Sequence, residues 1–430
     1  MKTEADGRAH IAHAEARARA QPAGFRPVRS ALLAGCGNVG AGLAFALDAA
    51  GIAVHVAERP DAVARCTDML GRLVDDAVAR GLCPAGEAAA RKARLAPRAG
   101  LADRPPAQIA IEAVDEDPDE KARALRALEA AAPEAEAVLT CSASLPVDAL
   151  AGACTLPARL TGLRIQPPAH LSRLAEIAPG PRTAPEARAA ALSLAHMLDK
   201  LALTLAAGAP SPVERLRRRM LEVAEMILLD GSVPWEVDAA MEAFGFSPGP
   251  FAAQDITGLD ADYVIRRRAA PTRDPARRYV PISDRMVQEG RLGRKVGVGW
   301  YRYPGGGGAV IDPLLEDMIT EEARFARVSR REFDADQIRT RLIAALVNEA
   351  AAILDEGVLA SAAEIDLVSV HALGFPRARG GLLWHADRIG LARILDDLTR
   401  LAREDPAVWT PAPLLARLVA EGPGFTDAAG

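Results

Sequence analysis

The most regular pattern of apolar and polar positions lies near the N-terminus, in residues 30–58. A short apolar run ends in GCGNVG, residues 35–40, and a helical pattern follows until Gly51. The next run, IAVHVAE, places apolar side chains at alternate positions and closes on Glu58. This order predicts a strand, a glycine-rich loop, a helix and a second strand with an acidic residue at its end.

Later segments extend the same architecture. Two further apolar runs, at 107–117 and 135–150, predict buried strands, and each leads into polar residues. Parallel sheets bind ligands at the carboxyl ends of their strands, so these polar residues are candidates for a site. From about residue 184 the apolar spacing becomes helical, and it is helical again after a loop rich in Pro, Arg and Gly over roughly 266–310. The pattern predicts an α/β domain followed by helices.

The helical region contains an internal repeat. The segments EVAEMILLDG and FGFSPGPFAAQDITGLD, within residues 222–260, are echoed by NEAAAILDEG and LGFPRARGGLLWHADRIGL, within residues 348–391. In each copy a helix with Glu and Ala ends in Gly, and a Gly-Phe turn opens the segment that follows. We therefore expect two duplicated helical subdomains that pack on each other.

Composition and charge narrow the classes of function. The 430 residues are too many for one compact core, so we expect two or three domains. A net charge of −5 and the lack of basic blocks argue against nucleic-acid binding. No apolar run is long enough to span a membrane, and the charged first 29 residues lack the pattern of a secretory signal.

The cysteines and histidines suggest neither a metal site nor a disulfide framework. Five cysteines are scattered along the chain, and neither they nor the seven histidines follow a metal-binding spacing. This set predicts reduced thiols, no bound metal and a cytoplasmic location. Cys141 is expected to be a small apolar filler and not a nucleophile, because no histidine is near it in sequence.

The glycine loop and Glu58 together predict a dinucleotide site. Gly35 permits the tight turn, Gly37 lets the backbone approach a pyrophosphate, and Gly40 allows close packing of helix and strand. Glu58, 18 residues after Gly40, is placed to bind a ribose diol and to repel a 2′-phosphate, which favours NAD over NADP. Arg59, the next residue, is a small signal in favour of NADP. The alternative is a glycine turn in an α/β domain that has lost its ligand.

Taken together, these motifs resemble the L-3-hydroxyacyl-CoA dehydrogenase family, in particular the dehydrogenase half of the bifunctional fatty-acid β-oxidation enzymes. The resemblance covers about residues 28–425 and lacks the hydratase half. Besides GCGNVG it rests on the segments IEAVDEDPDEK (111–121), LTCSASL (139–145), RLTGLRIQPPAHLSRLAEI (159–177), GFSPGPF, RLGRKVGVGWYRY and VNEAAAILDEG.

This resemblance implies an α/β Rossmann-type NAD-binding domain followed by two duplicated all-α domains of the 6-phosphogluconate-dehydrogenase-like type. We expect an N-terminal extension at 1–28, the NAD domain at 29–207, and helical domains at 208–310 and 311–430. The implied substrate is a small molecule, an acyl-CoA or a related thioester, and the implied assembly is a homodimer. The implied cofactor-binding residues are Gly35, Cys36, Gly37, Asn38, Val39, Gly40, Glu58, Glu112 and Lys121.

At the reaction centre the sequence departs from the family. A histidine that takes the hydroxyl proton aligns with Arg164, and the glutamate that orients it is kept as Glu176. A serine that positions the oxygen aligns with Ala143, and an asparagine aligns loosely with Glu214. Arginine has a pKa above about 12 and is not a proton acceptor at neutral pH, so standard 3-hydroxyacyl-CoA oxidation is not expected.

Other groups are poor replacements for the missing base. His170 is expected to pack in a loop, and strand alternation would aim Ser142 and Ser144 away from the direction of Ala143. We hypothesise that Arg164 pairs with Glu176, with Glu214 as a second acceptor.

Three functions remain open from the sequence. The chain is an NAD-dependent oxidoreductase in which Arg164 holds a substrate carboxylate or carbonyl, an NAD-binding pseudoenzyme that serves as a partner or regulatory subunit, or an acyl-thioester binding protein.

Overall fold

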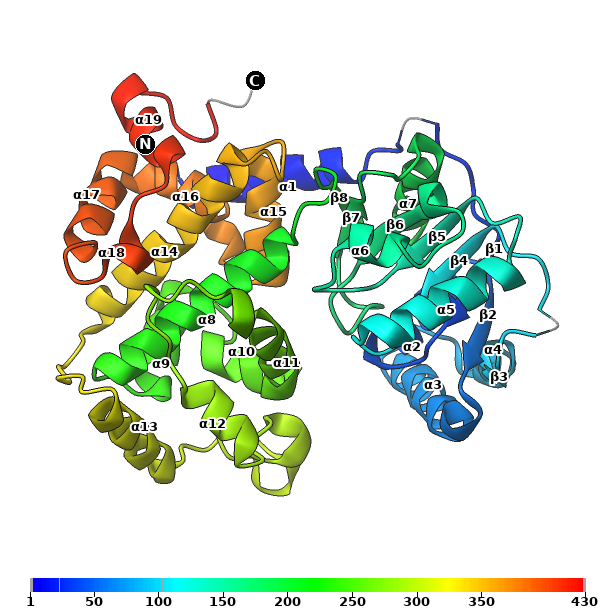
Figure 1. The fold of residues 1–430 in the computed structure, drawn as a ribbon, viewed down its shortest axis with the longest axis horizontal. Helices are drawn as coiled ribbons and strands as arrows, with labels where there is room; N and C mark the ends of the chain where they lie inside the picture. The colour runs from blue at the N-terminus through cyan, green and yellow to red at the C-terminus, as the bar shows by residue number, and fades with distance from the viewer. Residues whose placement is uncertain (1–2, 23, 103, 428–430) are drawn as a thin grey trace. The chain divides into compact units, whose positions relative to one another are not determined.

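The computed structural model describes residues 3–22, 24–102 and 104–427, and the chain divides into two compact units (Figure 1). One unit is His13–Ser211, and the other combines Met1–Ala12 with Pro212–Gly430. Among the residues that are described, no helix has both the length and the apolar composition needed to cross a bilayer.

The first unit is built on one eight-stranded sheet in the order β3-β2-β1-β4-β5-β6-β7-β8. All neighbouring pairs are parallel except β6 and β7, which are antiparallel. The strands are β1 (Ser30–Ala34), β2 (Ala53–Glu58), β3 (Arg98–Ala99), β4 (Ile109–Glu112), β5 (Ala137–Thr140), β6 (Leu160–Arg164), β7 (Leu174–Pro179) and β8 (Leu201–Thr204).

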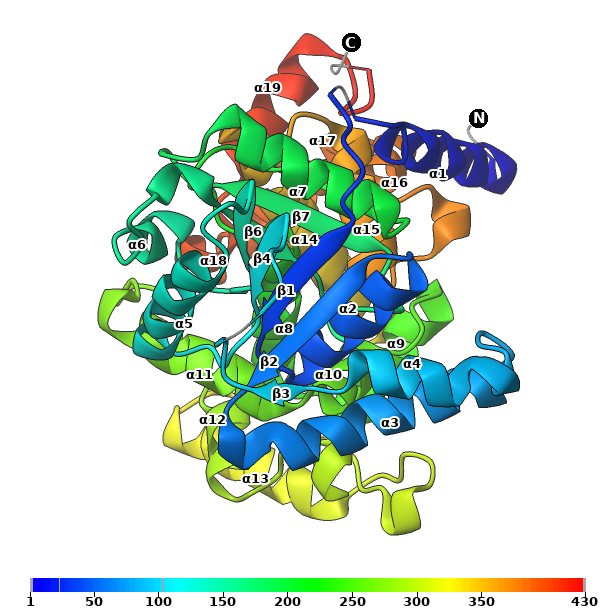
Figure 2. The same ribbon diagram turned by 90° about the vertical axis from the view of Figure 1, so that its right-hand side faces the viewer.

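Helices cover both faces of this sheet, as right-handed crossovers in opposite directions from β1 require (Figure 2). The core on one face joins alternate strand residues such as Leu33 and Ile111 to α2, α3 and α7, while α5 lies across the sheet from α2. The helices of this unit are α2 (Asn38–Ala49), α3 (Val63–Ala79), α4 (Ala88–Leu95), α5 (Pro118–Ala131), α6 (Val147–Ala151) and α7 (Pro185–Met197). The predicted strand–loop–helix–strand order at 30–58 is confirmed.

The second unit is helical, with α14 packed along α8 (Figure 1). Helix α1 (Glu4–Ala18) begins in this unit. The first repeat and its extension hold α8 (Pro212–Asp230), α9 (Pro234–Phe244), α10 (Pro250–Thr257), α11 (Leu259–Ala269), α12 (Ile282–Gln288) and α13 (Pro313–Phe325). The second repeat holds α14 (Ala335–Asp355), α15 (Ala362–Ala372), α16 (Leu382–Ile389), α17 (Leu391–Leu401), α18 (Pro406–Trp409) and α19 (Pro413–Glu421).

Two details differ from the sequence prediction. The expected loop over 266–310 contains α12, whose amphipathic turn buries Ile282 and Met286. Strands β7 and β8 extend the sheet beyond the apolar runs that predicted strands, and β8 has only four residues, of which alternate ones are fully buried. The two strands follow β6 in the sheet, and β7 carries Glu176 opposite Arg164.

The internal repeat is confirmed by two matching pairs of aspartates, three of them buried, that make equivalent hydrogen bonds. Asp238 on α9 accepts hydrogen bonds from two backbone N–H groups in the first turn of α10, at 2.9 Å each. Asp366 on α15 accepts two from the first turn of α16, at 2.7 and 3.3 Å. Asp255 accepts from the N–H groups of residues 300 and 301, and Asp387 accepts from those of residues 425 and 426. In each repeat, one carboxylate therefore accepts from the N–H groups at a helix start, and a second accepts from those of a segment distant in sequence.

The two repeats differ in the side chain that hydrogen-bonds to the aspartate below the helix start, which is Asp238 in the first repeat and Asp366 in the second. In the first repeat the Tyr301 hydroxyl donates to Asp238 at 2.8 Å. In the second repeat His10 of α1 takes that place, with its Nε2 2.8 Å from the Asp366 carboxylate. Burial raises the pKa of Asp366 to about 6, and the hydrogen bond from His10 acts against this rise. The N-terminal helix thus supplies a polar partner that the second repeat lacks.

The first prediction concerns this contact. We expect His10→Ala to lower the free energy of unfolding by about 1–3 kcal/mol, because a buried carboxylate loses a hydrogen-bond donor. Chemical denaturation followed by circular dichroism measures the change. His13→Ala is the matched control, since His13 is an exposed residue on the same helix and its loss should cost less than about 0.5 kcal/mol. Equal effects of the two variants would contradict the prediction.

Candidate functional site

The loop between β1 and α2 has the shape of a pyrophosphate cradle. Gly35 has a φ of +95°, and a Cβ on it would lie 2.5 Å from the carbonyl oxygen of Ala113. A Cβ on Gly40 would lie 2.1 Å from the carbonyl oxygen of Gly35, so the helix can pack this close only without a side chain. Gly37, which caps α2, has open space where a Cβ would be. The backbone at the N-terminus of α2 is therefore exposed to a ligand.

Glu58 lies at the end of β2, beside this loop. Its carboxylate accepts a hydrogen bond from the backbone N–H of Cys36 at 2.8 Å and another from Arg59 at 2.8 Å. Arg59 itself lies 3.8 Å from Asp61 and 3.6 Å from Glu120, so acidic neighbours face its guanidinium. The carboxylate thus sits next to the turn at which a ribose diol would lie, and these residues fit an NAD cofactor.

Cys36 corrects an expectation. Its sulfur is bonded to that of Cys66 on α3, with 5.8 Å between the two Cα atoms. The prediction that all cysteines are reduced was therefore wrong for this pair. The two residues are 30 positions apart with no motif between them, so only the fold brings them together. Cys83, Cys141 and Cys154 are free thiols, and burial raises the pKa of Cys141 to about 12, in accord with an apolar filler.

Glu112 and Lys121 form a buried ion pair, and that they contact the cofactor stays a prediction. The Lys121 ammonium lies 2.8 Å from Glu112, donates to the Val114 carbonyl at 3.1 Å, and is 1% exposed. Thr140 at the end of β5 donates to the other oxygen of Glu112 at 2.6 Å. Burial would lower the pKa of Lys121, but the two neighbouring carboxylates outweigh it and raise that pKa. The pair fastens α5 to the carboxyl ends of β4 and β5.

Glu116 is a site residue that the sequence analysis missed. One of its oxygens accepts from the Ser142 hydroxyl at 2.7 Å, and from the Ser144 hydroxyl and backbone N–H at 2.8 and 2.9 Å. Its other oxygen lies 3.4 Å from Lys121. Burial alone would raise the pKa of Glu116, but Lys121 and the serine hydrogen bonds reverse this and lower it. Nothing in the acidic run DEDPDE, residues 115–120, distinguishes Glu116 as the residue that binds the two serines.

The turn that follows β5 is shaped by Glu116. The expected strand alternation at Ser142 and Ser144 was wrong, because β5 ends at Thr140 and the chain bends there. Both hydroxyls converge on the same carboxylate oxygen. Ala143 lies between these two serines in the bend that Glu116 holds through its hydrogen bonds.

Arg164 is the last residue of β6 and is 9% exposed. Its Nε donates to the carbonyl oxygen of Ser142 at 3.1 Å, and its Nη1 lies 3.5 Å from the carbonyl oxygen of Ala209. Glu176 stands opposite Arg164 in the antiparallel pairing of β6 with β7, is 2% exposed, and accepts from the Ser211 hydroxyl at 2.6 Å. The sheet therefore brings together the two charged residues that the sequence singled out.

Two other candidates lie in different surroundings. His170 packs its ring edge-on against Phe45 of α2, and burial, followed by the charge of Lys200, lowers its pKa. Lys200 donates to the carbonyl oxygens of Ala169 and Ser172, which fixes the loop around His170. Glu214 belongs to the helical unit, where Arg217 of the same helix binds it at 2.6 Å. That Glu214 accepts from Arg164 stays a prediction.

The families that match this chain divide it near residue 211, as the two structural units do. The family profile for the "3-hydroxyacyl-CoA dehydrogenase, NAD binding domain" matches residues 31–207. The profile for the "3-hydroxyacyl-CoA dehydrogenase, C-terminal domain" matches residues 212–303 and 338–425. The chain belongs to the 3-hydroxyacyl-CoA dehydrogenase family. NAD is accordingly the cofactor of its first unit.

Relatives and solved structures agree with this assignment. The chain is similar to the peroxisomal bifunctional enzyme of Danio rerio, 33% identical over 415 residues, which cover 92% of this chain and 57% of that protein. It is 28% identical to the fatty acid oxidation complex subunit alpha of Acinetobacter baylyi, over 93% of this chain and 56% of that one. The chain thus spans little more than half the length of these relatives.

Solved structures show the same fold. A 3-hydroxybutyryl-CoA dehydrogenase from Escherichia coli K12 matches with a TM-score of 0.76 at 20% identity, over 92% of this chain and 99% of that chain. The dehydrogenase part of multifunctional enzyme 1 from C. elegans matches with a TM-score of 0.65 at 21% identity, over 94% and 96% of the two chains. At these identities the likeness concerns the fold alone.

The predicted ion pair between Arg164 and Glu176, which face each other across β6 and β7, can be tested by stability. We expect Glu176→Ala to lower the free energy of unfolding by about 3–5 kcal/mol, because an arginine would be left buried without its carboxylate. Denaturant unfolding measures the change. Glu186→Ala, at an exposed position of α7 in the same unit, should cost less than about 0.5 kcal/mol. A loss below about 1 kcal/mol for Glu176→Ala would mean that no such pair exists.

Proposed function

We propose that this protein is an NAD-dependent oxidoreductase for an acyl-CoA or related thioester, in which Arg164 binds the reacting oxygen of the substrate. The observation that carries the proposal is the combination of a complete NAD loop, with Glu58 beside it, and a buried cation at the carboxyl end of β6. The catalytic roles of Arg164, Glu176 and Glu214 are part of this proposal, as is the preference for NAD over NADP.

An arginine at this position can stabilise charge in the transition state but cannot serve as the base. NAD, when bound, accepts or donates the hydride. Oxidation of an alcohol also needs a base for the hydroxyl proton, and losing such a base typically costs about 10²–10⁴ in rate. A guanidinium cannot take up that proton, but its N–H groups can stabilise negative charge on a carbonyl oxygen during reduction. The nascent alkoxide can then take its proton from water. Oxidation crosses the same transition state, so the missing base slows both directions, and the guanidinium offsets part of that loss in both.

Contacts of the arginine side chain favour a second candidate function. The guanidinium already binds the Ser142 carbonyl and reaches that of Ala209, so part of its donor capacity holds the chain itself. An NAD-binding partner or regulatory subunit without turnover would need only this structural role. Binding and turnover measurements separate the two functions.

The cofactor half of the proposal is tested by NADH titration. We expect binding that Glu58→Ala weakens about 10–100-fold, because hydrogen bonds from a ribose diol to a charged group are worth about 1.5–3 kcal/mol. Fluorescence transfer from tryptophan to bound NADH gives the dissociation constants. Glu134→Ala, an exposed carboxylate after α5, is the control and should bind like wild type. Unchanged NADH affinity in Glu58→Ala would contradict the proposed role of Glu58.

The reaction itself is tested in both directions. We expect wild type to reduce acetoacetyl-CoA with NADH, and to oxidise 3-hydroxybutyryl-CoA with NAD, slowly but measurably in single-turnover assays. The double variant Arg164→His with Ala143→Ser should raise the oxidation rate at least 10-fold, since it supplies a base and an oxygen-positioning hydroxyl. Thermal unfolding of the double variant controls for its fold. NADH binding without reduction by wild type would sink the oxidoreductase proposal and support the partner function.

A further inference from the structure

The disulfide between Cys36 and Cys66 lies inside the cofactor-binding apparatus. Cys36 is the second residue of the GCGNVG loop, and Cys66 is in the first turns of α3, the helix that follows Glu58. Both residues are buried, with 1% and 2% exposure. The bond therefore ties the loop that approaches the pyrophosphate to the helix behind the strand that carries the ribose-binding acid.

This bond and the Glu58 hydrogen bond act on the same residue. The backbone N–H of Cys36 donates to Glu58 at 2.8 Å, while its side chain is covalently held by α3. Cys36 is thus fixed on two sides, and the loop that follows it is pre-organised. A pre-organised loop loses less conformational entropy on binding, so its affinity is higher than that of the same loop without the cross-link.

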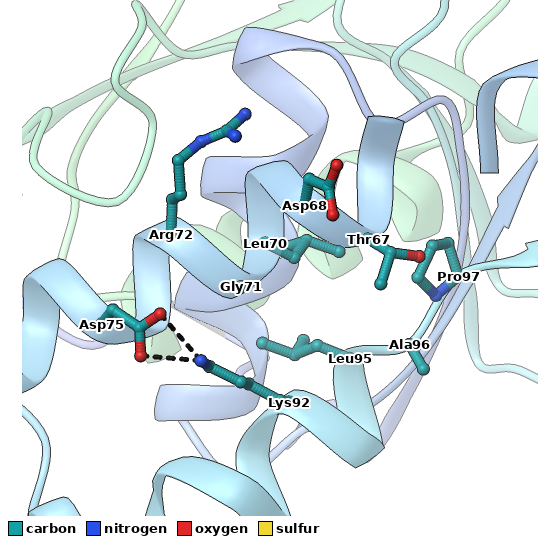
Figure 3. Close-up of a pocket in the computed structure, with 10 residues that line it drawn as sticks. All are labelled: Thr67, Asp68, Leu70, Gly71, Arg72, Asp75, Lys92, Leu95, Ala96 and Pro97. Atoms are coloured by element: carbon teal, nitrogen blue, oxygen red, sulfur yellow. Dashed lines mark hydrogen bonds and ion pairs between the residues drawn. The ribbon is translucent and has the colours of Figure 1, made fainter. Parts of the chain in front are cut away.

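A pocket opens beside the part of α3 that follows Cys66. It has a volume of about 370 Å³ and lies between α3 and α4, where Leu70 and Leu95 face each other (Figure 3). Leu70 lies one turn beyond Cys66 on the same helix face. Lys92 and Asp75 pair at 2.7 Å at its rim. A small molecule in this pocket would sit beside the helix turn that holds one end of the disulfide.

We propose that the Cys36–Cys66 disulfide is a reversible redox site that sets the affinity of the protein for NAD(H). A small dithiol reduces it: a thiolate of the dithiol attacks one cysteine sulfur, the S–S bond breaks, and the departing cysteine thiolate takes a proton. The second thiol of the reagent then displaces the other cysteine, which is also protonated. Two electrons and two protons pass to the protein, and the reagent becomes a disulfide.

Thermodynamic linkage makes the proposal reciprocal. If the disulfide form binds NADH more tightly by some factor, NADH must stabilise the disulfide against reduction by the same factor. Coupled sites in proteins typically differ about 5–150-fold in affinity, and we expect at least about 5-fold here. A disulfide that only stabilises the fold would resist reduction equally with and without NADH.

The experiment compares NADH affinity in the two redox states of the full-length protein. Dithiothreitol should weaken NADH binding of wild type at least about 5-fold, and oxidised dithiothreitol should restore it. Cys66→Ser leaves the loop residue in place but removes the bond, so it should bind like reduced wild type in either buffer. Cys154→Ser, which changes a free thiol of the same unit, should behave like wild type in both.

Two further measurements decide the outcome. Alkylation and mass spectrometry in dithiothreitol redox buffers should show that saturating NADH shifts the reduction midpoint of the Cys36–Cys66 pair toward stronger reductant by the same factor as the affinity ratio. Affinities that agree within 2-fold in the two states would overturn the proposal, as would five free thiols in the oxidised protein. If neither redox state binds NADH, the redox proposal fails together with the cofactor assignment, whereas equal, tight binding leaves the oxidoreductase proposal standing.

Discussion

The functional edge of the sheet depends on one buried ammonium. Lys121 enters from α5 and lies between the carboxylates of Glu112 and Glu116, so one cation is shared by two acids that would otherwise repel each other. Through Glu112 this cation is tied to the ends of β4 and β5, and through Glu116 to the turn after β5. A lysine that is buried without such partners would lose its charge, so the acids and the lysine must be present together. Together the lysine and the two acids fix the path of the bend that follows β5.

Arg164 is held by the bend that follows β5. Its Nε binds the carbonyl oxygen of Ser142, and Ser142 is held in turn by Glu116, so the arginine is positioned by the same network that fixes α5. A permanent cation at a buried strand end demands a carboxylate nearby, and Glu176 lies directly across the strand pair. Glu176 is therefore placed where its carboxylate can compensate the charge of Arg164.

Much of the fold could be predicted because its signals are local. The spacing of Gly35, Gly37 and Gly40 followed by Glu58 at a strand end leaves little freedom for a different structure, and the helical repeat is visible in the letters. The parts that could not be predicted depend on distant residues. The bond between Cys36 and Cys66 needs α3 to fold back along the loop, and no spacing rule encodes that approach.

The repeat shows the same limit in energetic terms. Both copies keep an aspartate at a helix start, and this signal is local. The side chains that hydrogen-bond to the two aspartates come from different parts of the chain. Tyr301 comes from the loop of its own repeat, whereas His10 comes from the opposite end of the sequence. A buried carboxylate must be satisfied, yet the requirement does not specify which residue does so. Duplicated sequence therefore predicts the shared skeleton of the repeats, and the three-dimensional path of the termini decides how each copy is completed.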